Sequence, residues 1–160
     1  MATTGEPRLT IMDSSDSVTV SEWHLGTVKA ATETDTMTIN VWNNRGGVTV
    51  VSDLQEMSIT TKNVTGGDDE EQLVVDKWVQ CMINDSDDYT AIGGATVCPI
   101  AHKNASGSDL TNHVLKGSAN DGTTANSSAN YAKVTLKVVP PINATAGSHS
   151  FKIRIQGYYV

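Results

Sequence analysis

The side chains that most often bind metal ions are scattered along this chain rather than grouped at the spacings that metal sites use. The four histidines form no HxxxH or HExxH pair. They are His24, His102, His113 and His149. Cys81 and Cys98 are too far apart in sequence to form a CxxC motif. We therefore expect no transition-metal site and no cofactor.

Two short acidic loops carry the oxygen ligands that calcium prefers. They are Asp13–Asp16 and Asp85–Asp88. Neither loop has the central glycine and the distal bidentate glutamate of an EF-hand at the required spacing. Solvated turns are the favoured interpretation, and no metal ligand is predicted from either loop.

Nucleophilic and phosphate chemistry also lack their usual motifs. There is no G-x-S-x-G elbow, and many combinations of Ser, His and Asp could be imagined as a triad in any chain of this composition. The paired glycines at 46–47, 66–67 and 93–94 stand alone, without a P-loop or GxGxxG pattern, and indicate hairpin turns. A pair of carboxylates acting on a sugar stays open from sequence alone. The expectation is a protein with no catalytic residues, not an enzyme.

The charge pattern bears on the class of partner. The chain has 160 residues and a formal net charge of −7, and its 11 Lys and Arg are scattered singly. Its densest charge run is acidic, Asp68–Glu71. Nucleic-acid binders normally carry a basic stripe, so nucleic acid is not an expected partner. No apolar run approaches the ~20 residues of a membrane span, and the N-terminus lacks the pattern of a signal peptide. We expect synthesis in a cytoplasm, no membrane association and two buried free thiols.

Alternation of apolar and polar residues dominates the chain, and helical periodicity is nearly absent. The clearest strands are Tyr131–Val139 and Phe151–Gln156, which we expect to pair as a closing antiparallel hairpin. Their inward residues are Ala132, Val134, Leu136 and Val138 in the first strand, and Phe151, Ile153 and Ile155 in the second.

Earlier segments have the same character. Further strands are expected in Ser17–Trp23, Asp35–Trp42, Val48–Val51, Met57–Thr61 and Asp76–Ile83, with two short strands in Tyr89–Ile100. In Asp35–Trp42 the favoured inward face carries Met37, Ile39 and Val41, and the alternative is the face that carries Trp42. A total of about eight to ten strands is typical of an antiparallel sandwich or barrel.

The N-terminal residues 1–12 are predicted to form an extended arm, followed by a single domain over residues 13–160. The arm carries Leu9, Ile11 and Met12, which are available to dock on a neighbouring molecule. These three residues are candidate contact residues.

Two long polar loops, Ala101–His113 and Ser118–Asn130, interrupt the strand pattern. At the C-terminus, Tyr158 and Tyr159 are adjacent, so in a strand they point to opposite faces and one of them is free to contact a neighbour. Both tyrosines join the candidate contact residues.

Two segments resemble immunoglobulin-like modules. Trp23–Asn44 contains Leu-Gly-Thr-Val-Lys-Ala-Ala, similar to an opening strand and bend of the form F/L-G-x-V-x-A-G, with Ala31 in place of the glycine. Asn143–Ile155 contains Ala-Thr-Ala-Gly before an alternating strand, similar to a closing hairpin of such domains. The resemblance implies an all-β, immunoglobulin-like antiparallel β-sandwich with long polar loops.

An acidic module of this kind, rich in Thr and Asn, is similar to structural proteins of tailed bacteriophage virions. The resemblance implies a capsid decoration (cement) protein on the outer surface of a phage head, made in the host cytoplasm. Its expected partners are the major capsid protein and neighbouring copies of itself. A tail-associated immunoglobulin-like module and a carbohydrate- or cell-surface-binding module are the alternatives.

Overall fold

The computed structural model of the protein describes residues 4–86, 88–100 and 113–160. Over these residues the chain is nearly all β, as predicted, with only one short helix and one 3-10 turn. The elements are β1 (Leu9–Asp13), β2 (Met37–Asn43), β3 (Gln55–Asn63), α1 (Gln72–Val75), β4 (Val79–Ile83), β5 (Thr90–Ile92), β6 (Cys98–Pro99), η1 (Ser128–Asn130), β7 (Tyr131–Val138) and β8 (Phe151–Tyr158).

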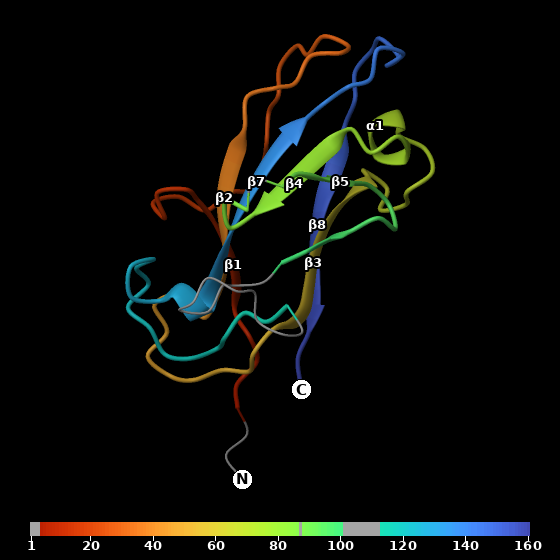
Figure 1. The fold of residues 1–160 in the computed structure, drawn as a ribbon. Coiled ribbons are helices and arrows are strands. Elements are labelled where there is room, and N and C mark those ends of the chain that lie inside the picture. Colours follow the sequence, from red (N-terminus) through yellow and green to blue (C-terminus); the bar gives the residue numbers. More distant parts are fainter. Residues whose placement is uncertain (1–3, 87, 101–112) are drawn as a thin grey trace.

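The strands form two antiparallel sheets of unequal width (Figure 1). The wide sheet has five strands in the order β1-β2-β7-β4-β5, and the narrow sheet has three in the order β6-β3-β8. The predicted hairpin between Tyr131–Val139 and Phe151–Gln156 is therefore wrong: β7 pairs with β2 and β4, and β8 pairs with β3. Alternation shows which face of a strand is buried but not which sheet contains it, and Pro140 and Pro141 end the ladder directly after β7.

One hydrophobic core lies between the sheets. The inward residues predicted for β7 are all buried, and they meet Met57 and Ile59 of β3 in the same cluster. In β2 the favoured face is partly confirmed, since Ile39 and Val41 are buried and Met37 is half-buried. The opposite face of β2 is buried as well, because the Trp42 ring stacks on Tyr131 with 4.7 Å between ring centroids.

Two segments predicted as strands are irregular. In Ser17–Trp23 only short contacts with β1 form, where Asp13 N–H donates to Val18 O and Val20 N–H donates to Ile11 O. Val48–Val51 forms no strand: Val51 has an isolated bridge to Gly5 and its N–H donates to Gly117 O, while Val48 is 90% exposed. In both segments the β-branched residues favour extended backbone, but no neighbouring strand supplies a continuous ladder.

The predicted N-terminal arm also differs from the structure. Residues 9–12 belong to β1, the edge strand of the wide sheet, where Leu9 is opposite Asn43 and Ile11 is opposite Val41. Met12 is buried on the other face. A strand of only five residues is too short to show alternation clearly, so its pairing with β2 could not be read from the sequence. Residues 1–3 of the predicted arm lie outside the described residues.

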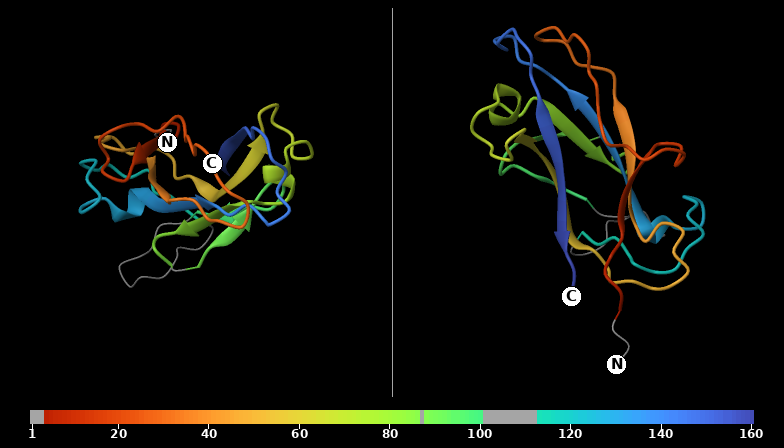
Figure 2. Two further views of the ribbon diagram at one scale, coloured as in Figure 1. Left: turned by 90° about the horizontal axis from the view of Figure 1, so that it is seen from above. Right: turned by 180° about the vertical axis from the view of Figure 1, so that it is seen from behind.

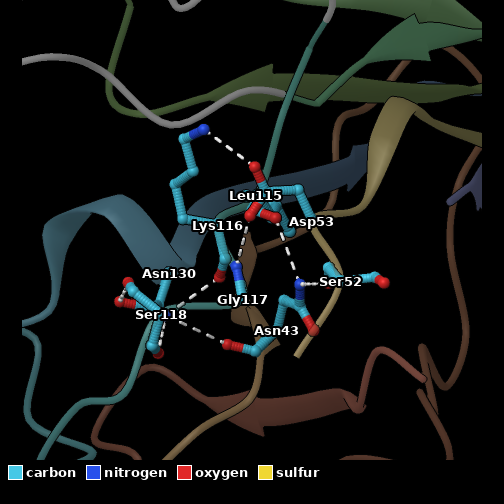
Figure 3. A network of polar contacts seen from close by, with 8 residues as sticks. All are labelled: Asn43, Ser52, Asp53, Leu115, Lys116, Gly117, Ser118 and Asn130. Atoms are coloured by element: carbon cyan, nitrogen blue, oxygen red, sulfur yellow. Dashed lines mark hydrogen bonds and ion pairs between the residues drawn. The ribbon is translucent and has the colours of Figure 1, made fainter. Parts of the chain in front are cut away.

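Buried amide side chains hold the loops at the end of the molecule below β7 (Figure 3). Asn43 and Asn130 each donate two hydrogen bonds of 2.8 to 3.1 Å to backbone carbonyls of neighbouring loops, and Asn130 also donates a longer one of 3.5 Å to Asn43 O. The loop carbonyls belong to Ser52, Leu115, Lys116 and Ser118. Since an unpaired buried carbonyl is costly, each amide takes the place of ladder bonds that strands would supply.

The two cysteines come from different sheets and meet in the core. Cys81 lies on β4 and Cys98 on β6, and both are buried and free. The Cys81 thiol donates a hydrogen bond to the Cys98 sulfur. This hydrogen bond and burial together raise the pKa of the Cys81 thiol. A protonated thiol is a poor nucleophile, so this thiol is expected to be unreactive in the folded protein.

Alkylation tests this state of the cysteines. Because both thiols are buried, iodoacetamide at neutral pH should label neither of them in the folded protein at a rate comparable with free cysteine. It should add two labels after unfolding without a reductant. A requirement for reductant before labelling would contradict the free-thiol assignment.

Alanine substitutions distinguish the fully buried part of the core from the part that borders the other sheet's open edge. Leu136 of β7 is fully buried, so Leu136→Ala should lower the free energy of unfolding by about 2–5 kcal/mol. Ile153 of β8 is only half-buried, and Ile153→Ala should cost less than Leu136→Ala in the same denaturant titration. Equal losses would show that β8 is as fully packed as β7.

Candidate interaction groove

An open groove lies between the two sheets along one side of the molecule. It has a volume of about 900 Å³, at the upper end of the ~300–1,000 Å³ found for ligand pockets. One wall is made by β1 and β2, the second by β8, and the third by the irregular segment at residues 20–26. The apolar lining includes Leu9, Ile11, Trp23, Phe151, Ile153 and Ile155. We refer to this feature as the edge groove.

The edge groove is the place where the core stays incompletely covered. All of the half-buried apolar residues that pack against the core line the groove, except Ile83 and Ala144. Trp23 covers one end, with its ring edge-on to Phe151 and 6.2 Å between centroids. The apolar surface here is therefore continuous with the core rather than a set of isolated exposed residues.

Basic side chains line the outer face of β8. Lys62 of β3 is directly opposite Lys152, and Arg154 follows on the same face. Lys62 has a salt bridge to Asp68 at 3.0 Å, and the Arg154 guanidinium donates to Gly66 O at 3.4 Å. Over the part of the chain that the structure describes, neither Lys152 nor Arg154 has an ion-pair partner.

At the start of β8, His149 links the loop before the strand to the helix. Its Nδ1 is 2.5 Å from the Glu71 carboxylate, its Nε2 is 2.9 Å from Thr145 O, and its ring meets Trp78 at 4.8 Å between centroids. The hydrogen bond to Glu71, followed by the one to Thr145 O, raises the pKa of His149. Both ring nitrogens face acceptors, so the arrangement suits the doubly protonated imidazolium.

The candidate contact residues do not form one cluster. Leu9 and Ile11 line the edge groove, and Leu9 is 45% exposed. Met12 is buried on the opposite face of β1 and is unavailable for contact, so this candidate is wrong. Tyr158 and Tyr159, at the end of β8 and just beyond it, are 49% and 47% exposed.

The sequence predicts other positions for several of the groove residues. Phe151, Ile153 and Ile155 were expected in a closed core, and Trp23 was placed in a strand. The signal that could have identified the edge is the lysine and arginine that alternate with these apolar residues at 152 and 154, because charged residues are common on edge strands.

The acidic loops are occupied by their own hydrogen bonds. The Asp13 carboxylate accepts bonds from the Ser15 hydroxyl and from the backbone of Ser17 and Val18, which lower its pKa. The Asp16 carboxylate accepts from Trp42 Nε1 at 2.8 Å. In the second loop Asp85 pairs with Lys133, and Asp87 lies outside the described residues.

Among the described residues, no three side chains of His, Cys, Asp or Glu are grouped as metal ligands would be. Within the same ranges, no helix is long and apolar enough to cross a membrane. No family model, curated protein or solved structure matches the chain.

The His149–Glu71 pair makes stability depend on pH. Because folding raises the pKa of His149, its contribution is fully present below the unfolded pKa of about 6.5 and is lost as pH rises through the folded value. The difference in melting temperature between the native protein and His149→Gln should therefore be larger at about pH 6 than at about pH 9. The matched control is His24→Gln, which removes an exposed histidine–glutamate pair and should change the melting temperature little at either pH. A His149→Gln effect independent of pH would contradict the assignment.

Proposed function

We propose that this chain is a non-enzymatic structural module of a tailed-bacteriophage virion, a capsid decoration protein bound to the outer surface of the head. The single observation that carries the proposal is the edge groove, an apolar surface continuous with the core and left open at the side of the molecule. A concave apolar surface rimmed by polar residues is one of the forms that a binding site for another protein takes. Its partner in the proposal is the major capsid protein.

The immunoglobulin-like nature of the module is part of the proposal. Two antiparallel sheets around one core support it. So does Ala31, which stands where the resembling motif has glycine and has a φ of 59°, a left-handed conformation that glycine adopts most readily. The chain turns at this residue, where Ala31 N–H donates to Pro140 O.

Further exposed residues extend the surface toward the chain ends. The described part of the chain begins and ends at the same end of the molecule (Figure 2). Tyr158 and Tyr159 stand next to the C-terminal Val160, whose carbonyl accepts a bond from the Ser52 hydroxyl at 3.4 Å. On a shell, many copies with modest contacts of this kind would be held together by avidity, with neighbouring copies adding to each attachment.

The carbohydrate-binding alternative has less support. A sugar site usually needs an aromatic face that is open to the ligand and lies in a groove. Trp42 and Trp78 are buried, and the exposed Tyr158 and Tyr159 do not line the edge groove. Trp23 packs edge-on against Phe151 at the groove.

Sedimentation with capsids tests the proposed function. Leu9→Ser removes an exposed apolar side chain from the edge groove and should lower occupancy on shells stripped of the native copy by about tenfold, because a buried interface residue of this size is worth about 1.5 kcal/mol or more. Val48→Ser is the matched control, since Val48 is exposed but does not line the groove. Its occupancy should equal that of the native protein.

Both variants must first show native melting temperatures. Equal occupancy of Leu9→Ser and the native protein would place the capsid contact elsewhere. Failure of the native protein to bind any capsid, together with binding on a glycan array, would replace the proposal with the carbohydrate-binding alternative.

A further inference from the structure

β8 has one hydrogen-bonding edge without a partner. It pairs with β3 along one side, and no bridge or backbone hydrogen bond among the described residues reaches its other side. The strand has eight residues, so this edge is roughly 26 Å long. In an antiparallel strand about half of the peptide groups point to each side, and the free half here faces the edge groove. Such an edge is a template for one more strand.

The two faces of β8 define the side chains that an added strand would need. The inner face carries Phe151, Ile153 and Ile155, which are half-buried and line the groove. The outer face carries Lys152 and Arg154, with Lys62 of β3 beside them. Residues directly opposite each other on one face of an antiparallel pair interact, and like charges in that position are destabilising.

A second copy of β8 does not meet these needs. If the apolar residues of both copies face the core, the outer-face residues of one copy lie next to the outer-face residues of the other. In the register that puts Ile153 of the two copies opposite each other, Lys152 of each copy would be opposite Arg154 of the other. This repulsion acts against edge-to-edge pairing of two copies, in the way that lysines protect many natural edge strands.

We propose that the free edge of β8 binds an extended segment of a partner protein in which acidic side chains alternate with apolar ones. The segment becomes a fourth strand of the narrow sheet. Its apolar side chains enter the edge groove between β8 and β1, and its carboxylates lie beside Lys152 and Arg154 on the outer face. Main-chain bonds supply a large part of the affinity and the alternating side chains supply specificity. This inference rests on the proposed function only for the identity of the partner, which would be the capsid protein.

Charge complementarity is what selects this partner. The chain as a whole has a net charge of −7, so an acidic segment is repelled by most of the surface. Beside β8, the positive charges of Lys152 and Arg154 have no ion-pair partner over the described residues. The one acidic side chain that lines the groove, Glu22, is exposed and shares a hydrogen bond of 2.8 Å with His24.

Peptide binding tests the proposal directly. The probe is a capped peptide of about seven residues in which valine alternates with glutamate, compared with a peptide that has lysine at the glutamate positions. Titration followed by NMR should show binding of the glutamate peptide only. Amide hydrogen exchange should then slow for residues of β8 whose N–H groups face the groove, because strand addition gives these groups acceptors.

Charge reversal provides the matched variants. Lys152→Glu combined with Arg154→Glu should weaken binding of the glutamate peptide by about tenfold or more and create binding of the lysine peptide. Lys29→Glu combined with Lys77→Glu makes the same change in net charge without altering a groove residue, and should leave both peptides as in the native protein. Native hydrogen-exchange patterns in β7 verify that each variant is folded.

Three outcomes would overturn the strand proposal: no binding of the glutamate peptide, binding without slower exchange in β8, or equal weakening by the control pair. Capsid sedimentation separates this result from the proposed function. If capsids bind the protein and excess glutamate peptide does not displace it, the strand proposal fails while the proposed function stands. If the peptide binds β8 and capsids do not bind the protein, the proposed function fails while the strand site stands.

Discussion

Because the five-stranded sheet is wider than the three-stranded sheet that faces it, strands alone do not close the core along both sides. In the interior, β7 lies between two neighbours and its inward residues are fully buried. At the side where β1 and β8 are the sheet edges, the corresponding residues are only half-buried, and an irregular segment with Trp23 supplies the remaining cover. The apolar groove follows from this mismatch in width, and the free edge of β8, which any open sheet must have, borders it.

The low apolar content of the chain is compatible with a folded core because amide side chains replace part of the backbone pairing. Only 38% of the residues are hydrophobic, and long segments between the strands have no ladder. Asn43, Asn44 and Asn130 satisfy carbonyls of those segments from within the structure. Asn43 also accepts from Arg8 N–H at 3.0 Å, which places the chain at the start of β1. Asparagines, which are typical of turns and surfaces, thus contribute to the interior of this protein. Asn43 also positions the start of β1, which forms part of one wall of the groove.

Individual strands were predictable from the sequence to the extent that one face is buried and the other is wet. β7 has this pattern over its whole length, and its inward residues were identified correctly. The partners of a strand depend on contacts far apart in sequence, so the same alternation in β8 gave its inner face correctly but the wrong sheet. Ser17–Trp23 has the composition of a strand, but no neighbouring strand pairs with it along its length. In contrast, β1 pairs with β2, but its five residues are too few to show alternation clearly. The groove could not be predicted, because it is set by the difference between two sheet widths and not by any one segment.

Lys152 and Arg154 help to explain how a protein with an open strand edge can remain unpaired with its own copies. An exposed edge lined with apolar residues would pair with any extended chain, and an additional copy is the most abundant one at high local concentration. Basic residues on the outer face make that pairing unfavourable while leaving the backbone groups of β8 accessible. The same charges favour a strand with carboxylates in the facing positions, so protection against self-association and choice of partner come from one feature. Since these side chains are exposed and screened by salt, their effect is on which strand binds more than on how tightly it binds.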